Sequence, residues 1–259
     1  MSHLKLNDFC FPVVERQVAV DDVQSPVVDW ENPNTYIPAR NHKAIVREDT
    51  SELISIVKDS YNVIPNEVLI NKLLHFLATS SEPFRIDPTH SFVQDNRMRL
   101  QITFPDLSLQ DSESEIPLSL FLHNSYDMSE GVRFYFGAIR AICSNGMVFG
   151  EILGKYYSKH TCGFELEDFA SRLEEAKSYF PAIQNRIDQL QMLPATEQLV
   201  EQVSDRISKR LADQVLETQQ IRQLSQWQLL NRVTHYISHD VDKPTRARHQ
   251  QSVSRIFGL

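Results

Sequence analysis

Alternation of apolar and polar residues between positions 97 and 104 constrains the fold more than any other feature of the chain. The apolar positions are Met98, Leu100, Ile102 and Phe104. The polar positions between them are Arg97, Arg99, Gln101 and Thr103. A period of two residues is typical of a β-strand that packs one face on a core and turns the other toward solvent or a ligand. The same period recurs at residues 116–122, so we expect two strands of a mostly antiparallel sheet.

Further strands and one helix are expected around this pair. A hairpin is predicted at residues 43–58, with its turn at residues 48–51. Apolar residues at helical spacing from Val68 predict a helix that ends near Ser80, with Asn66 as its N-cap. Residues 132–143 are apolar on both faces except for two arginines, which predicts a central and covered strand. One short strand is also expected at residues 13–20.

The second half of the chain is expected to be helical. Apolar residues at spacings of three and four predict a long helix over residues 166–190, kinked at Pro181. Similar stripes predict helices at residues 199–211, with Thr196 as a cap, at 224–237 and at 253–257. The predicted fold class is α+β, a mostly antiparallel sheet with one packed helix, followed by a helical C-terminal region. Three regions are expected: an irregular N-terminal arm (1–40), an antiparallel sheet domain with one helix (41–162) and a helical C-terminal region (163–259).

Composition narrows the class of protein. The 259 residues carry a formal net charge of −8, which argues against coating of nucleic acid by the whole molecule but not against a local basic face. Three cysteines, Cys10, Cys143 and Cys162, show no close pairing, so we expect no disulfide framework and a cytoplasmic location. No apolar run approaches the roughly 20 residues that span a bilayer, and no signal-peptide pattern begins the sequence. We therefore expect no membrane association.

Candidate catalytic and metal-binding groups give only weak signals. His123, Ser125 and Asp127 would share a face of an extended strand, but this segment is more typical of a turn. A zinc site could also be formed by Cys143, His160, Cys162 and His123, but their spacing fits no compact zinc-ligand signature. The sequence also contains no Walker-type or dinucleotide-binding glycine loop. We expect no enzyme activity, no cofactor and no metal site.

Basic residues form the more informative pattern. Lysine or arginine beside aromatic rings is the composition that tracks a phosphate backbone and stacks bases. The candidate nucleic-acid-binding residues are Arg97, Arg99, Arg133, Arg140, Lys155, Tyr156, Lys159 and His160. For any one of them a solvated or packed side chain is the simpler explanation, and it is their grouping beside one sheet that favours binding. A second basic stretch at residues 243–255 is explained equally well by an exposed helix face.

Several separated motifs resemble one prokaryotic family. They lie at residues 46–50, 61–66, 124–127, 137–146, 160–161, 227–236 and 257–258. On these motifs the chain resembles phage/plasmid-like proteins with a domain of unknown function (DUF932-like), over most of its length after about residue 40. One departure is Tyr126-Asp127-Met128, which stands where members commonly carry a His-Asp-Gly turn. The resemblance implies a phage or plasmid context, where recombination and replication accessory proteins are common, and brings no established activity.

The expected element order is also similar to that of single-strand annealing recombinases, which is a similarity of fold alone. We therefore predict a phage/plasmid-type protein that binds single-stranded DNA, with a homo-oligomeric annealing or recombination factor as its specific form. The alternative is a protein-interaction or host-defence-interference module without DNA binding, whose helical half binds a partner. A hydrolase at residues 123–127 is a third hypothesis, and it requires activity that is lost in His123→Ala.

Overall fold

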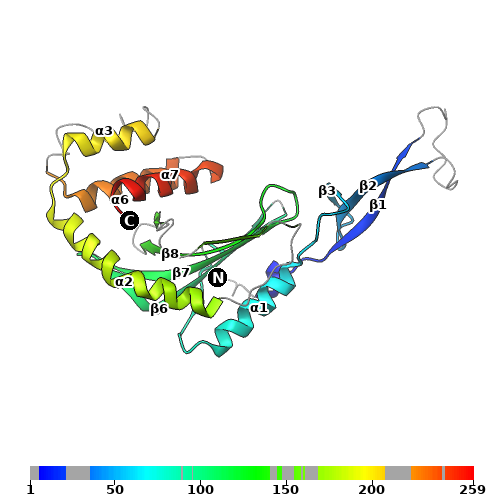
Figure 1. The fold of residues 1–259 in the computed structure, drawn as a ribbon, viewed down its shortest axis with the longest axis horizontal. Coiled ribbons are helices and arrows are strands. Elements are labelled where there is room, and N and C mark those ends of the chain that lie inside the picture. The colour runs from blue at the N-terminus through cyan, green and yellow to red at the C-terminus, as the bar shows by residue number, and fades with distance from the viewer. Residues whose placement is uncertain are drawn as a thin grey trace.

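Two antiparallel sheets and a set of helices make up the structure (Figure 1). This computed structural model describes residues 6–21, 36–88, 90–94, 96–140, 145–147, 155–158, 160, 169–207, 223–240 and 243–259. A short 3-10 helix, η1 (Leu6–Phe9), precedes the strands, and the described elements from residue 169 onward are all helices. The predicted α+β class is confirmed.

The first sheet has the strand order β1-β2-β3 and projects away from the rest of the molecule (Figure 1). Its strands are β1 (Val13–Asp21), β2 (Tyr36–Arg47) and β3 (Leu53–Lys58), and both pairings are antiparallel. The predicted hairpin and the predicted strand at residues 13–20 are therefore present. β2 runs across the boundary expected at residue 40, so the described part of the N-terminal region contributes a full strand to this sheet and is not an irregular arm.

The second sheet has the order β10-β8-β7-β6-β4, with β5 also paired to β6 and β9 to β8. Its long strands are β6 (Arg97–Gln110), β7 (Glu115–Ser125) and β8 (Val132–Arg140). Its short strands are β4 (Arg85–Ile86), β5 (Phe92–Gln94), β9 (Asn145–Met147) and β10 (Lys155–Ser158). The strand predicted at residues 132–143 is present as β8, and it is an interior strand as expected, because β7 pairs with one side of it and β9 and β10 pair with the other.

Helix α1 (Asn66–Thr79) follows the first sheet. Its N-cap is Pro65 rather than the predicted Asn66, which is the first helical residue and is buried. Helix α2 (Phe169–Met192) continues through Pro181. Helix α3 (Glu197–Arg206) begins at the predicted cap, since the Thr196 hydroxyl accepts a hydrogen bond of 3.2 Å from the N–H of Leu199. The last two described helices are α6 (Gln226–Asp240) and α7 (Lys243–Ile256).

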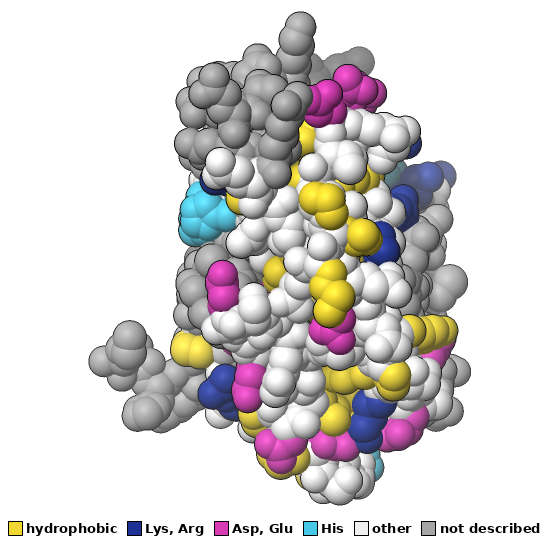
Figure 2. Space-filling model, turned by 90° about the vertical axis from the view of Figure 1, so that its left-hand side faces the viewer, with side chains coloured by type: hydrophobic (Ala, Val, Ile, Leu, Met, Phe, Trp, Pro, Cys, Tyr) yellow, Lys and Arg dark blue, Asp and Glu magenta, His cyan; other side chains and the backbone are white. Residues whose placement is uncertain are grey.

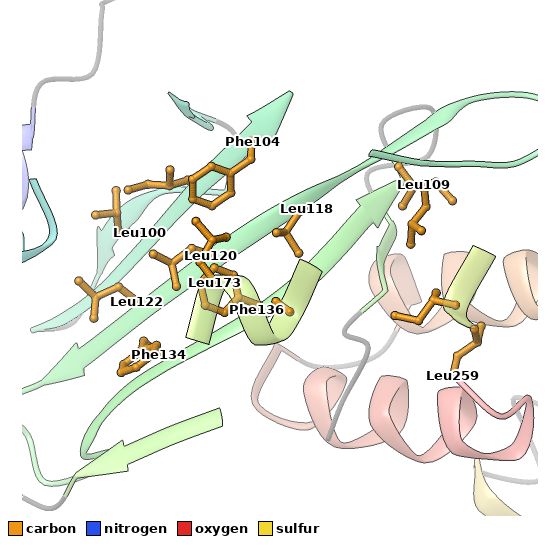
Figure 3. Packing of buried hydrophobic residues seen from close by; sticks show 14 of the residues in the cluster. Leu100, Phe104, Leu109, Leu118, Leu120, Leu122, Phe134, Phe136, Leu173 and Leu259 are labelled. Carbon is orange, nitrogen blue, oxygen red and sulfur yellow. The ribbon is translucent and has the colours of Figure 1, made fainter. Parts of the chain in front are cut away.

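The hydrophobic core lies between one face of the second sheet and the helices. Figure 3 shows Phe104, Leu118 and Phe136, from three adjacent strands, on the side of the sheet where the α2 segment with Leu173 lies. All four side chains are buried, and burying one of this size contributes about 1.5–3 kcal/mol. The same cluster includes residues of α1, α3, α6 and α7, so the regions predicted at 41–162 and 163–259 share one core.

The surface at the helical end of the molecule has mixed character. Figure 2 shows small hydrophobic patches there, separated by acidic and basic side chains. No helix in the described part of the chain combines the length and the apolar character that crossing a membrane requires.

Candidate functional site

The motif at residues 124–127 lies at the end of β7 and holds a buried hydrogen-bond network. The Asn124 side-chain amide donates to the Asn66 side-chain oxygen (2.7 Å) and to the Ile64 carbonyl (3.0 Å). The Asn66 side-chain amide in turn donates to the carbonyl of Phe9 (2.9 Å). Both asparagines are at most 1% exposed, and buried polar groups of this kind need partners. This network connects β7, the start of α1 and the N-terminal segment.

Tyr126 extends this network to the first sheet. Its hydroxyl accepts a hydrogen bond of 2.7 Å from the backbone N–H of Asn66, and its carbonyl accepts one of 2.7 Å from the Ser55 hydroxyl on β3. Its ring meets Phe11 edge to face, with the ring centroids 5.4 Å apart. Burial raises the pKa of Tyr126, so the phenol stays neutral at physiological pH. The motif therefore has a structural role in joining the two sheets.

The 126–130 loop is closed by side-chain hydrogen bonds of the kind that form turns. The Ser125 hydroxyl donates to the Glu130 carbonyl (2.8 Å) and accepts from the Glu130 N–H (3.0 Å). The Asp127 carboxylate accepts from the N–H of Ser129 (2.9 Å), which is an Asx-turn. A catalytic cluster with His123 would need the Ser125 hydroxyl as nucleophile and the Asp127 carboxylate as the group that orients the histidine. Both groups are instead engaged in the hydrogen bonds of the loop. The loop has the geometry of the turn predicted as the alternative to a catalytic cluster.

Arg97 and Arg99, on the face of β6 opposite the core, are paired with carboxylates of this loop. The Arg97 guanidinium donates to Asp127 at 2.9 Å, and that of Arg99 makes a two-bond contact with Glu130. The side chain of Arg97 is 40% exposed and that of Arg99 is 22% exposed. Arg97 is therefore the more accessible of the two, while Arg99 is held in the forked geometry typical of arginine and a carboxylate.

Cross-strand pairing places Arg133 in the same region. Arg99 is opposite His123 on β7, and His123 is opposite Arg133 on β8. The adjoining row contains Phe121 and Tyr135, whose rings stack with centroids 4.9 Å apart. Side chains opposite each other in an antiparallel sheet share a face, so two arginines and two aromatic rings occupy adjacent rows of one face. Of the two rings, Phe121 is buried and Tyr135 is partly exposed. We call Arg97, Arg99, His123 and Arg133, together with Phe121 and Tyr135, the arginine–aromatic face.

The arginine–aromatic face combines a neutral histidine with three arginines. Burial, assisted by the positive charges of Arg99 and Arg133, holds the pKa of His123 well below its usual value, so this histidine is neutral at pH 7. Two of the three guanidinium groups, those of Arg97 and Arg99, pair with the carboxylates of Asp127 and Glu130. The described groups of this cluster carry an excess of one positive charge, in a protein whose total charge is negative.

The polar face of β6 is exposed over a shorter length than its alternating sequence predicts. Gln101 and Thr103, expected on an open surface, are 1% and 4% exposed. The Gln101 side-chain amide donates to the Ser119 hydroxyl (3.3 Å), and its backbone N–H donates to the Ser91 hydroxyl (3.0 Å). Alternation along a strand shows which residues share a face but not whether that face is covered. Among the described side chains, the partly exposed arginines of this face lie at its end near the 126–130 loop.

The remaining predicted binding residues are placed differently or are not described in full. Arg140 pairs with Asn145, Lys155 with Tyr135 and Tyr156 with Phe134 in the backbone register, while their side chains and all of Lys159 lie outside the described residues. His160 is buried; its ring stacks on Tyr61 with centroids 4.7 Å apart, and its Nδ1 lies 3.2 Å from the Asn62 carbonyl. Burial lowers the pKa of His160. We therefore remove His160 from the candidate interface, because its ring is packed against protein.

Sequence reasoning missed the acidic partners of the arginines. Asp127 and Glu130 lie 30 and 31 residues beyond Arg97 and Arg99, and only the hairpin between β6 and β7 brings them together. The sequence does give one signal for these pairs: both acidic residues lie in the loop directly after β7, the strand that pairs with β6. Within the described residues no group of His, Cys, Asp and Glu side chains could hold a metal ion, while Cys143 and Cys162 lie outside those residues.

Fold and site together define an α+β protein in which a hydrogen-bonded loop joins two antiparallel sheets beside an arginine–aromatic face. A family model described as a domain of unknown function (DUF932) matches residues 53–257, and the chain belongs to this family. No curated protein and no solved structure gives a significant match. The family resemblance is thus confirmed, whereas the similarity to single-strand annealing recombinases gains no support from these comparisons.

Proposed function

We propose that this protein binds single-stranded DNA through the accessible end of the arginine–aromatic face. The observation that carries the proposal is the cross-strand row Arg99–His123–Arg133 beside the partly exposed ring of Tyr135, which stacks on the buried Phe121. Guanidinium groups bind phosphates and aromatic rings stack on bases, and the two together suit a single strand whose bases are exposed. Arg97 and Arg133 contact the backbone phosphates in this proposal.

The ion pairs determine which arginines a strand can use. Arg99 makes two bonds to Glu130, so a phosphate would have to displace a well-placed carboxylate. Arg97 donates to Asp127 at 2.9 Å, and its side chain is more exposed than that of Arg99. Substitution of Arg99 would also leave the carboxylate of Glu130, which is 16% exposed, without its bidentate partner. Arg97 and Arg133 are therefore the informative positions to change.

Fluorescence anisotropy with a labelled single-stranded oligonucleotide at low salt tests the proposal. Arg97→Gln/Arg133→Gln should bind at least tenfold more weakly than the wild type, because two charge-assisted contacts are lost. Arg172→Gln is the control for loss of a positive charge elsewhere, since it removes one positive charge from α2 on the opposite face of the sheet. Circular dichroism of each variant separates loss of binding from loss of folding. Equal affinity of the double variant and the control overturns the proposal.

A role as an annealing factor would require more than DNA binding. It requires a large homo-oligomer, which size-exclusion chromatography with light scattering measures directly. A monomer that binds single-stranded DNA would support the binding function and exclude a ring-forming annealing factor.

A protein-interaction module is the second candidate, and one observation favours it. β3 is an edge strand of the first sheet as described, and it exposes Leu53 (55%) and Ile56 (47%). Exposed edge strands with apolar side chains are templates for pairing with another chain. This candidate predicts that the protein has no affinity for DNA. It also predicts a stable complex with a partner in pull-downs from a host lysate, and loss of that complex in Ile56→Lys.

A further inference from the structure

Phe92 of β5 lies beside the arginine–aromatic face, in register with its arginines. Its backbone pairs with Arg99, which pairs in turn with His123, so one cross-strand row runs from β5 through β6 and β7 to Arg133 on β8. Residues paired in this way share a face of the sheet, with neighbouring Cβ atoms about 4.5–5.5 Å apart. Alternation along β5 agrees, because the next residue, Val93, packs against the hydrophobic core. Phe92 is therefore on the same face as the arginines.

The ring of Phe92 is more accessible than the two rings of the arginine–aromatic face. Phe121 is 8% exposed and stacks on Tyr135, which is itself partly buried. Phe92 is 41% exposed. A flat ligand can therefore cover more of the Phe92 ring than of either of the other two.

Exposure alone does not give Phe92 a role, because single exposed hydrophobic residues are ordinary on protein surfaces. Phe84 shows the difference. It is 39% exposed, but it lies two residues before Ile86, which packs against the core, so alternation places it on the other face of the sheet. Phe92, in contrast, is the cross-strand neighbour of an arginine, and rings beside guanidinium groups are the combination that binds single strands.

We infer that Phe92 stacks on an unpaired base of the bound strand and makes the site selective for single-stranded over double-stranded DNA. The inference rests on the proposed function, because it concerns the same face of the sheet. In a duplex each base is stacked between its neighbours, whereas the bases of a single strand can be splayed out onto an aromatic side chain. Stacking uses the flat face that every base has, so the contact requires no particular base sequence.

Fluorescence anisotropy at low salt tests the inference with two labelled probes, a single-stranded oligonucleotide and a duplex of the same length. Phe92→Ala should bind the single strand about tenfold more weakly, because one stacked base is lost. The slope of log affinity against log salt concentration should not change, because no phosphate contact is lost. Affinity for the duplex should also stay the same. Phe84→Ala is the matched control, since it removes a similarly exposed phenylalanine from the other face and should bind as the wild type does.

Phe92→Trp provides a second readout that keeps an aromatic ring at this position. This variant should bind as tightly as the wild type, and the fluorescence that it adds to the wild-type signal should be quenched when the single strand binds. The fluorescence added by Phe84→Trp should not be quenched. Circular dichroism of each variant separates loss of binding from loss of folding.

The inference and the proposed function fail in different ways. If the wild type binds and Phe92→Ala binds as tightly as Phe84→Ala, stacking by Phe92 is rejected and the proposed function stands. An equal loss of affinity for both probes, or a shallower salt slope in Phe92→Ala, would mean that the substitution disturbs the arginines, and it would also overturn the inference. Absence of binding by the wild type rejects the proposed function and this inference with it.

Discussion

The hydroxyl of Tyr126 accepts a 2.7 Å hydrogen bond from the backbone N–H of Asn66, the first residue of α1. The first N–H groups of a helix lack partners within the helix, and here the N-cap Pro65 supplies no side-chain bond. A phenol from the loop after β7 therefore takes the place of a capping side chain. This contact ties the motif at residues 124–127 to the start of the helix that follows the first sheet.

Tyr126→Phe should lower the free energy of unfolding by about 1–3 kcal/mol, because it leaves the buried N–H of Asn66 without its acceptor. Urea denaturation followed by circular dichroism measures the change. Tyr61→Phe is the matched control, since the Tyr61 hydroxyl donates over 3.4 Å to the Ser125 carbonyl, which is at the long limit for such a bond. If both variants lose the same stability, the capping role of Tyr126 is wrong.

Met128→Gly should increase the stability of the protein by up to about 1 kcal/mol. Met128 has a φ of +63°, a left-handed conformation that costs a residue with a Cβ roughly 1–2 kcal/mol and costs glycine almost nothing. The added backbone freedom of glycine in the unfolded chain offsets part of this gain. Met128→Ala, which removes the exposed side chain but keeps the Cβ, serves as the comparison in thermal denaturation. A glycine variant no more stable than the alanine variant would refute the strain argument.

Stability should decline as the pH falls below about 6.5, the ordinary pKa of histidine. The folded-state pKa of His123 is lowered, chiefly by burial, so between the two pKa values the unfolded chain binds the proton more readily than the folded chain. The groups around it are Arg99 and Arg133, which oppose protonation, and Glu130, 4.0 Å from Nδ1. The loss can reach about 1.4 kcal/mol per pH unit for one group. His160 has the same direction of shift and adds to it.

Urea denaturation at about pH 7.5 and about pH 5.5, on either side of the ordinary histidine pKa, measures this dependence. His123→Gln should lose less stability than the wild type over this interval. His75→Gln, which changes an exposed histidine on α1, should follow the wild type. A His123→Gln variant with the full wild-type dependence on pH would show that this histidine is not the cause.

Thr196→Ala should destabilise the protein by roughly 0.5–2 kcal/mol, since the N–H of Leu199 loses its capping hydroxyl. Chemical denaturation compares this variant with Thr196→Ser, which keeps the hydroxyl and should stay close to the wild type. Equal destabilisation by alanine and serine would mean that the methyl group, and not the cap, matters at this position.

The sequence predicts those parts of this fold that arise from local periodicity. Alternation around Leu100 and Leu120 predicts β6 and β7, and the spacing around Leu73 and Val203 predicts α1 and α3. It does not predict the strand order, because the addition of β10 to β8 depends on a pairing between segments about 23 residues apart.

The candidate site is predictable only in part, because its decisive contacts are long-range. The arginines are visible in the strand pattern, but their neutralisation by Asp127 and Glu130 depends on the β6–β7 pairing. The bond between Asn66 and Asn124 joins residues 58 positions apart, so a local pattern indicates a turn at residue 124 and gives no sign of a buried network. Burial of Gln101 likewise depends on the pairing of β5 and neighbouring segments with β6.

The salt dependence of single-stranded DNA binding tests the central claim most directly. Each phosphate neutralised on a single strand contributes about −0.7 to the slope of log affinity against log salt concentration. In fluorescence anisotropy the wild type should bind at low salt with a clearly negative slope, and Arg97→Gln/Arg133→Gln should have a slope shallower by about 1.4. Arg172→Gln should keep the slope of the wild type. Absence of binding at low salt, or a slope that the double substitution leaves unchanged, would contradict the account.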